Sequence, residues 1–460
     1  MTRVLSTALV AALLSCTPPA TEFAHGLGEP RDAFGGVGTP FAGTGFFRTE
    51  RAGERWWLVT PTGGAFLSFG VTSVTPDGTY APRLNAFPYR AAILAKYGSP
   101  EAWATATAER LRAWGFTSLG AWSREDLFRG RFPSTINASL AGADWVSGAV
   151  PDYFSDEWEV AVRQRAHERL AAYVDDAWLV GVFLDNELRW GRDWRAPKDE
   201  LLRDYFRLDA RSAGRAKALE FLHHEHGSIE AFNAAWGSRF ASWSELEASS
   251  ELPREQDPID VQRRFLTLVA ERYFAVTVAA VRAELPHHLV LGCRFVSVLT
   301  PPEALAAAAR HVDVISFNSY TFVEGVSEQT RTLFGPVVET DELMTAYAAP
   351  GLPMLISEFG FRARDSGLPN SWPPIYPTFE TQADRARAFE GYTRRAFRNP
   401  ALVGVHWFTW ADQPATGRFD GENNNFGVVS IADEPWTPLT ERMSDVFPSV
   451  LSGAYTSTRR

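Results

Sequence analysis

Short apolar runs alternate with longer amphipathic stretches along most of this chain. The clearest apolar runs cover residues 65–72, 116–122, 178–185, 289–295, 312–320, 353–361 and 402–410. A weaker candidate for a further strand lies near 135–146. Buried strands separated by helices favour βαβ units and a parallel sheet.

Helical patterns lie between most of these runs, at 99–115, 155–174, 259–285, 301–310, 380–398 and 436–447. Ser99 and Ser155 are suitable N-caps, and Gly115 suits a helix end. Eight such units predict an α/β fold, a (β/α)8 TIM barrel. The alternative is a doubly wound open sheet, but no Gly-rich phosphate loop follows the first strand. Nearly 100 residues between Trp190 and Leu289 predict a long helical insertion after strand 4.

The first residues are typical of an export signal. Arg3 precedes a short apolar run at 4–14, which ends in 13-LLSC-16. This pattern predicts a lipoprotein-type signal peptide over 1–16, with Cys16 lipidated, although ordinary cleavage nearby is the alternative. We expect a Pro/Gly-rich tether and N-terminal segment over 17–50, and the catalytic barrel domain over 51–450.

Composition narrows the possible partners. The 460 residues are 45% hydrophobic and 22% charged, as in ordinary soluble globular proteins. The net charge of −10 disfavours a nucleic-acid partner. Membrane contact is expected only through the lipid anchor, and the oligomeric state is left open. Cys293 is the only other cysteine, so no intramolecular disulfide framework is implied.

Two predicted strands end in carboxylates. Asn186 and Glu187 follow the fourth strand, and Glu358 ends the seventh. Functional side chains of a barrel project from the carboxyl ends of its strands, so both carboxylates are expected on one rim. Two carboxylates across a cleft suit glycoside hydrolysis, in which one acts as acid and base and the other attacks or activates water.

These motifs resemble those of the clan A retaining glycoside hydrolases. The resemblance implies that Glu187 is the acid/base, Glu358 the nucleophile and Asn186 the ligand of the sugar 2-hydroxyl. The stretches 183-FLDNELRWG-191, 116-FTSLGAWS-123 and 404-GVHWFTWADQPATGRFDGENNNFGVV-429 look like glycoside hydrolase family 50, the β-agarases. The segment 226-HGSIEAFNAAWGSRFASW-243 is also similar to the family 42 β-galactosidases. The resemblance covers about residues 56–447.

Two features depart from the family pattern. About 40 residues separate Cys16 from Trp56, too few for the N-terminal β-sandwich that family agarases usually carry. In 422-ENNNFG-427, Asn424 stands where an aromatic or bulkier residue is expected. Both changes bear on polymer binding more than on hydrolysis.

Other residues near the strand ends are candidate substrate ligands. Tyr320 is placed like the clan tyrosine that hydrogen-bonds the nucleophile, and Asn318 is a weaker companion. A solvent-facing hydroxyl is the plain alternative for Tyr320.

Aromatic rings and polar groups complete the predicted cleft. Trp122 and Trp407 end strands and could stack on sugar rings, although large rings are commonly core. His406, Arg294 and Glu422 could bind hydroxyls; for Arg294 a structural ion pair is an equal alternative.

The predicted function is retaining hydrolysis, by double displacement, of a β-galactan such as agarose or neoagaro-oligosaccharides. The alternatives are a β-galactosidase or other β-glycosidase or transglycosidase, and a non-catalytic glycan-binding lipoprotein. Retaining hydrolysis needs no cofactor or metal. The cluster 223-HHEH-226 is interpreted as a surface helix, because no third ligand is evident.

Overall fold

The computed structural model describes residues 30–196, 198, 200–320, 340–374 and 376–458. The predicted signal peptide, Cys16 and residues 17–29 of the tether lie outside these residues. Nine strands form one curled parallel sheet in the order β8-β7-β6-β5-β4-β14-β11-β10-β9. The strands are β4 (Ser68–Val71), β5 (Ser118–Leu119), β6 (Ser134–Asn137), β7 (Leu179–Phe183), β8 (Leu289–Val290), β9 (Phe295–Val296), β10 (Ile315–Asn318), β11 (Met354–Phe359) and β14 (Leu402–Trp407).

The two edge strands of this sheet are neighbouring parts of one stretch of chain, 289–296. Its first part pairs with β7 and its last part with β10. The Val290 carbonyl also accepts a hydrogen bond from the Val314 N–H, 3.2 Å away. Both edges therefore meet in one segment, which is consistent with the expected TIM-barrel-like fold. The weak strand candidate near 135–146 is present as β6.

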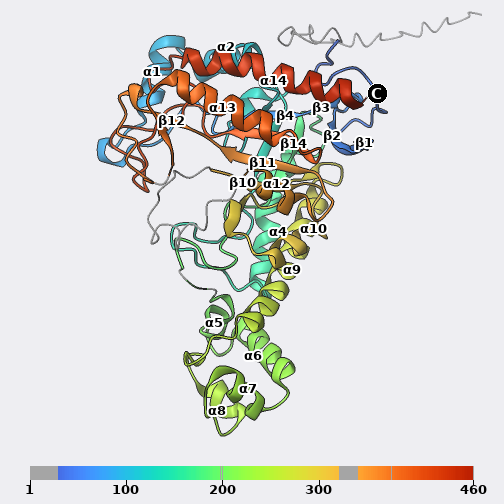
Figure 1. The fold of residues 1–460 in the computed structure, drawn as a ribbon, viewed down its shortest axis with the longest axis vertical. Helices are drawn as coiled ribbons and strands as arrows, with labels where there is room; N and C mark the ends of the chain where they lie inside the picture. Colours follow the sequence, from blue (N-terminus) through green and yellow to red (C-terminus); the bar gives the residue numbers. More distant parts are fainter. Residues whose placement is uncertain (1–29, 197, 199, 321–339, 375, 459–460) are drawn as a thin grey trace, which may run out of the picture.

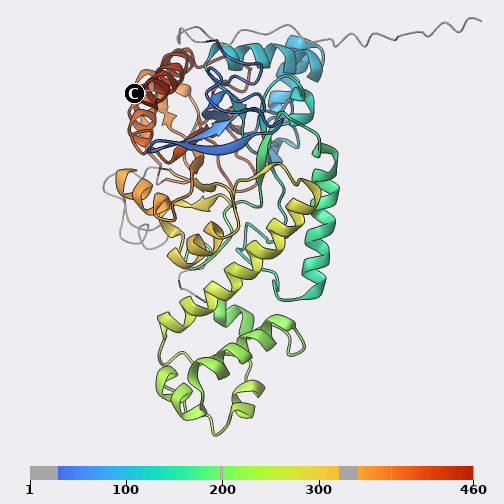
Figure 2. The same cartoon turned by 90° about the vertical axis from the view of Figure 1, so that its right-hand side faces the viewer.

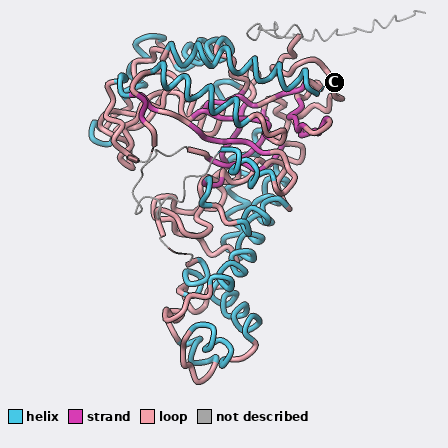
Figure 3. Tube along the Cα trace, viewed as in Figure 1, coloured by secondary structure: helices cyan, strands magenta, loops and turns pink. Residues whose placement is uncertain are grey.

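Helices cover the outside of the sheet (Figures 1 and 3). They include α1 (Pro88–Tyr97), α2 (Pro100–Ala113), α3 (Glu125–Phe128), α4 (Asp156–Leu170), α10 (Pro302–Ala309), α12 (Thr340–Ala348), α13 (Gln382–Ala396) and α14 (Thr437–Thr458). Ser99 and Ser155 cap α2 and α4 by accepting N–H bonds, as predicted. Phe447 of α14 stacks on Phe69 of β4 at 4.6 Å between ring centroids, so α14 covers that strand.

The last helix is longer than the pattern predicted. The sequence predicts an end near 447, before Pro448, yet α14 continues to Thr458 with Pro448 inside it. Proline removes one helical hydrogen bond. Phe447, Leu451 and Tyr455 are buried on both sides of the proline, so apolar packing offsets that loss.

A separate helical lobe lies between β7 and β8. It contains α5 (Leu201–Phe206), α6 (Ala213–His226), α7 (Ile229–Trp236) and α8 (Trp243–Ala248), and it extends away from the sheet (Figures 1 and 2). The long helix α9 (Ile259–Glu284) returns the chain to the barrel, where it packs on α4 and α10. No helix among the described residues is both long and apolar enough to span a membrane.

A small hairpin precedes the parallel sheet. Strands β1 (Arg48–Ala52) and β2 (Arg55–Val59) pair antiparallel, and β2 pairs with β3 (Ala65–Phe66). The described part of the predicted tether packs on it, since Val37 is buried and pairs with Ala65. Later in the chain, β12 (Arg362–Ala363) and β13 (Thr378–Phe379) form a two-stranded sheet. Short 3-10 turns occur at Pro82–Leu84, Ala171–Tyr173, Ser297–Leu299 and Arg364–Ser366.

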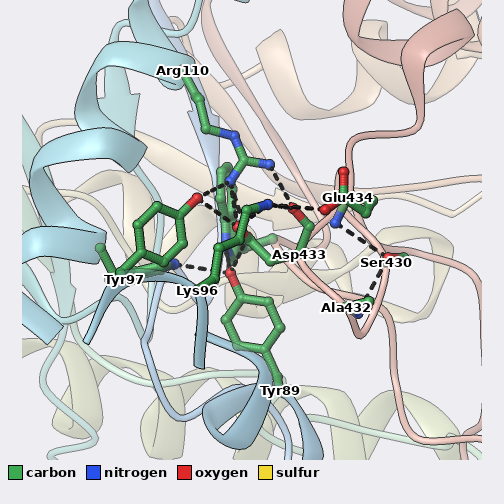
Figure 4. A network of polar contacts seen from close by, with 10 residues as sticks. Tyr89, Lys96, Tyr97, Arg110, Ser430, Ala432, Asp433 and Glu434 are labelled. Atoms are coloured by element: carbon green, nitrogen blue, oxygen red, sulfur yellow. Dashed lines mark hydrogen bonds and ion pairs between the residues drawn. The ribbon is translucent and has the colours of Figure 1, made fainter. Parts of the chain in front are cut away.

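A buried carboxylate joins the first two helices to the loop before α14 (Figure 4). Asp433 is fully buried and contacts Arg110 at 2.8 Å and Lys96 at 3.3 Å. The Tyr89 and Tyr97 hydroxyls donate to its two carboxylate oxygens at 2.6 and 2.8 Å. The charge is thus compensated and hydrogen-bonded, as a buried carboxylate requires.

Candidate active site

A pocket of about 860 Å³ opens at the carboxyl ends of the parallel strands. If β8 and β9, both in the stretch 289–296, are counted as one strand, every strand of the sheet contributes a residue at or just beyond its carboxyl end to the pocket lining. These residues are Ser73, Trp122, Asn137, Asn186, Val296, Tyr320, Glu358 and Phe408. A pocket of this size can enclose a small organic ligand such as a short oligosaccharide.

Glu358 lies in β11 and is 5% exposed. Its Oε1 accepts a hydrogen bond from the Arg294 Nη2 at 2.7 Å, and its Oε2 accepts one from the Tyr320 hydroxyl at 2.7 Å. Burial raises the pKa of Glu358 to about 7; the Arg294 charge and the Tyr320 hydrogen bond lower it, and the Glu187 charge raises it. The predicted contact between Tyr320 and Glu358 is therefore present.

Glu187 follows β7 and faces the same pocket. Its Oε1 accepts from the Asn318 Nδ2 at 2.9 Å, and its Oε2 accepts from the Trp145 Nε1 at 3.0 Å. The backbone at Glu187 has a φ of 51°, a conformation that side chains other than glycine adopt rarely. The strand therefore ends in a sharp bend that turns the Glu187 side chain toward the pocket.

Asn318 connects the two carboxylate-bearing strands. Its Nδ2 also lies 3.2 Å from the Asn186 Oδ1, and its Oδ1 accepts from the Ser357 hydroxyl at 2.8 Å. The Asn318 amide is thus fixed by the residue next to Glu358 while it donates to Glu187. The structure brings together Asn186, Glu187, Asn318, Tyr320 and Glu358, as the sequence predicts.

Arg294 is completely buried, and its contact with Glu358 is the ion pair that the sequence left as an alternative to ligand binding. Its guanidinium lies 4.2 Å from the centroid of the Trp122 ring. Trp122 is 40% exposed and lines the pocket. One face of this indole therefore covers the buried cation, and the side chain remains accessible to a ligand.

Glu422 lines the pocket from the loop after β14. The Gln413 Nε2 donates to its Oε2 at 2.5 Å, and the Arg418 Nη2 lies 3.0 Å from that oxygen. Burial raises the pKa of Glu422, and Arg418 opposes that shift. Glu422 is therefore a further carboxylate at the pocket, held by the loop that carries it.

The structure corrects the predictions for Trp407 and His406. Both are fully buried in β14, and neither lines the pocket. Successive side chains of a strand point to opposite faces of the sheet. Trp407 points to the outer face of the barrel, where it packs on Phe389 of α13. His406 points inward and bonds the Ser68 hydroxyl at 2.8 Å, in space that a side chain at Gly70 would fill.

Asn424 has a structural explanation for its departure from the family pattern. It is fully buried, its Oδ1 accepts from the Arg362 Nη1 at 2.7 Å, and its Nδ2 donates to the Trp372 carbonyl at 2.6 Å. The position needs both a donor and an acceptor, and an amide supplies both.

Several pocket residues were not predicted. Trp145 and Trp194 lie in loops without periodic patterns, and Arg418 and Phe419 lie in the loop that follows β14. Tyr376 stacks on Tyr320 at 4.7 Å between ring centroids. The density of Trp and Tyr in these loops was the available signal, but it did not indicate which rings face the pocket.

The histidine cluster lies in the helical lobe. The His223 Nε2 bonds Glu247 at 3.0 Å, and its ring stacks on Trp243 at 4.1 Å. The His226 Nε2 accepts from the Trp236 Nε1 at 3.1 Å. Within the described residues, no group of three His, Cys, Asp or Glu side chains could hold a metal ion.

The chain is similar to known proteins over most of its length. Beta-agarase B of Vibrio sp. (strain JT0107) is 29% identical over 486 aligned residues, which cover 89% of this chain and 49% of that protein. The solved structure of PfGH50B has a TM-score of 0.78 and 27% identity, covering 94% of this chain and 69% of that one. An exo-beta-agarase structure has a TM-score of 0.77 and 26% identity, covering 93% and 68%. No known family profile matches the chain.

These likenesses make the chain a homologue of glycoside hydrolases. Within that class it is similar to the β-agarases, and the resemblance to family 50 seen in the sequence is confirmed. The chain spans about half the length of the curated relatives it matches.

Proposed function

We propose that this protein is a retaining β-glycoside hydrolase that cleaves a β-galactan such as agarose or neoagaro-oligosaccharides. The observation that carries the proposal is the placement of Glu187 and Glu358 on one pocket, each held by two hydrogen-bond donors. The β-agarase relatives support the substrate class. No cofactor is needed for this chemistry.

In the first step, Glu358 attacks the anomeric carbon while Glu187 donates a proton to the departing glycosidic oxygen. Arg294 and Tyr320 hold the two oxygens of Glu358, so the nucleophile meets the sugar in one orientation. Asn186 already accepts a bond from Asn318 at its Oδ1, and its amide nitrogen would donate to the sugar 2-hydroxyl.

In the second step, Glu187 takes a proton from water, and that water attacks the glycosyl–Glu358 ester. The Glu358 carboxylate leaves, and the product keeps the β configuration after two inversions. The returning negative charge on Glu358 is stabilised by the same Arg294 and Tyr320 donors.

The pH dependence of the first step follows from the charge of the nucleophile. The pKa of Glu358 is raised to about 7, so the carboxylate loses its charge as the pH falls through that range. We expect kcat/KM to fall on the acid side of about pH 7 for this reason. Because a bound sugar displaces water from Glu358, the pH at which the rate falls will differ between the free and the bound enzyme. The pH profiles of kcat and kcat/KM therefore have to be measured separately.

Aromatic side chains on the pocket wall would bind the apolar faces of pyranose rings. Trp122 is 40% exposed, and Trp145, Trp194 and Trp372 line the same pocket. Arg418 and Glu422 offer polar groups from the opposite loop. The substrate expected from this lining is a neutral oligosaccharide.

The test is digestion of agarose, neoagaro-oligosaccharides and a set of nitrophenyl β-glycosides by the wild type and by Glu358→Ala. Release of neoagarobiose by the wild type, absent in the variant, would support both the substrate and the nucleophile. Substantial residual activity in Glu358→Ala would refute the nucleophile assignment. Activity restricted to other glycosides would refute the agarase substrate and keep the mechanism.

Azide rescue separates the two carboxylate roles. With an activated aryl glycoside, azide should rescue Glu187→Ala by attacking the glycosyl intermediate, which gives a β-glycosyl azide. In Glu358→Ala, azide would replace the nucleophile and give an α-glycosyl azide. The opposite assignment of products would exchange the two roles, and tight glycan binding without turnover by the wild type would refute the enzyme proposal.

We also propose that the chain is exported and lipid-anchored, with the signal peptide cleaved before Cys16, which carries the lipid as the first mature residue, 17–50 leading into the barrel, and 51–450 forming the catalytic domain. The support is the 13-LLSC-16 motif and the apolar run before it. Labelling with a radioactive fatty acid should mark the wild type and not Cys16→Ser. Equal labelling of both, or none, would refute the anchor.

A further inference from the structure

Trp145 makes an unassigned contact with the proposed acid/base. It lies in the loop between β6 and α4, and its indole Nε1 donates to the Glu187 Oε2 at 3.0 Å. The other oxygen of the same carboxylate accepts from the Asn318 amide at 2.9 Å. Both oxygens of Glu187 are therefore engaged by N–H donors.

The backbone around this contact is fixed by one buried ion pair. Arg195 donates from Nη1 to the Trp145 carbonyl at 3.0 Å and from Nη2 to the Glu187 carbonyl at 2.8 Å. Its side chain is 3% exposed and pairs with Asp193, which is 5% exposed. One guanidinium thus joins the main chain of the donor to the main chain of the acceptor.

The Trp145 ring is also supported from two other loops. The Trp194 ring lies 6.1 Å away, between centroids, and the Phe419 ring lies 6.3 Å away in an edge contact. All three rings line the pocket. The direction of the Nε1–H bond is therefore set by packing as well as by the backbone.

This geometry favours one protonation state. An ionised carboxylate is an acceptor only, so it can use both N–H donors fully, whereas the acid form must place an O–H on one of the two oxygens. We propose that Trp145 is a positioning residue that holds the Glu187 side chain and stabilises its carboxylate form, and thereby favours transfer of the Glu187 proton to the departing oxygen. This inference rests on the proposed function.

The proton balance over the two steps is complete. In the first step Glu187 gives its proton to the departing oxygen and becomes the carboxylate that Trp145 and Asn318 bind. In the second step the water proton passes to Glu187, and the water oxygen bonds the anomeric carbon as the ester to Glu358 breaks. Loss of the Trp145 donor should then slow the first step, most of all for substrates whose departing oxygen needs a proton.

The experiment compares Trp145→Phe, which removes the N–H, with Trp145→Gln, which keeps an N–H donor without the indole. In Trp145→Phe, kcat/KM for a β-glycoside with a poor alkyl leaving group should fall by about tenfold, the effect of one hydrogen bond to a charged group, whereas kcat/KM for an activated aryl glycoside should change little. Trp145→Gln should restore the wild-type ratio of kcat/KM between the two substrates, and Trp243→Phe, in the helical lobe, should leave that ratio unchanged.

A second measurement needs no sugar. The emission of Trp145, taken as wild type minus Trp145→Phe, should change with pH, and this change should disappear in Glu187→Gln. If the pH-dependent change persists there, or if Trp145→Phe and Trp145→Gln give the same ratio of kcat/KM between the two substrates, the inference is refuted. An enzyme that shows the fluorescence coupling but cleaves no glycan would refute the proposed function and retain the Trp145–Glu187 bond.

Discussion

Replacing Tyr320 by phenylalanine removes only the hydroxyl group that contacts Glu358. The Tyr320 hydroxyl donates to the Glu358 Oε2 at 2.7 Å, and the ring is also stacked on Tyr376. Tyr320→Phe keeps the ring and deletes the donor. A hydrogen bond to a charged group contributes about 1.5–3 kcal/mol, and one pH unit corresponds to about 1.4 kcal/mol. The pKa of Glu358, about 7 with the bond present, should therefore rise by about one to two units.

The sign follows from the charge that the bond stabilises. Tyr320 lowers the pKa of Glu358, so its loss moves the acid limb of kcat/KM to higher pH. Well below the limb, the rate should drop by about ten- to a hundredfold, since the ionised fraction falls with each unit. Above the new limb, much of the rate should return. The assay is kcat/KM for one soluble glycoside across the pH range of activity.

The control is Tyr392→Phe, whose hydroxyl lies 3.5 Å from the Ser319 carbonyl and does not reach Glu358. It should leave the limb in place. A Tyr320→Phe profile that falls uniformly at every pH, with no shift of the acid limb, would refute the electrostatic argument and indicate a purely steric role.

Three further predictions concern other parts of the molecule. Burial lowers the pKa of His406 from 6.5 to about 3, so protonation of this histidine opposes folding. The free energy of unfolding should therefore be unaffected above pH 6.5 and should fall below it, by about 2 kcal/mol at about pH 5. Denaturant titrations of His406→Asn should lack this pH dependence. Asp433→Ala should cost about 3–5 kcal/mol, because Arg110 loses its buried partner, and an unchanged denaturation midpoint would contradict this. Trp122→Ala should raise KM for oligosaccharides, whereas Trp407→Phe should lower the melting temperature without changing KM.

The polar residues at the strand ends were predictable because they interrupt apolar runs. Polar groups at the ends of apolar runs, as at Asn186, Glu187 and Glu358, have few structural explanations in a parallel barrel. The order of the strands then places them on one rim without any knowledge of the intervening loops. The role of Tyr320 came instead from the resemblance to the clan A hydrolases.

The errors at His406 and Trp407 arose within a single strand. Both residues lie near the end of β14, and a continuous apolar run does not reveal which face is inside. Trp145 was missed for a different reason. Its loop has no period, and the bonds that place it come from Arg195, 50 residues later in the chain. Long-range contacts of this kind leave no local trace in the sequence.

Arg294 lies in the segment that closes the barrel and contacts both Glu187 and Glu358. It lies in the stretch where the two edges of the sheet meet, where β8 and β9 have two residues each. Its carbonyl accepts from the Glu187 N–H at 3.3 Å, while its side chain pairs with Glu358. A local opening of this seam would therefore disconnect both carboxylates at once. Hydrogen exchange at the Arg294 and Glu187 amides should follow a single opening event. The rate of that event therefore limits how long the two carboxylates stay in their active arrangement.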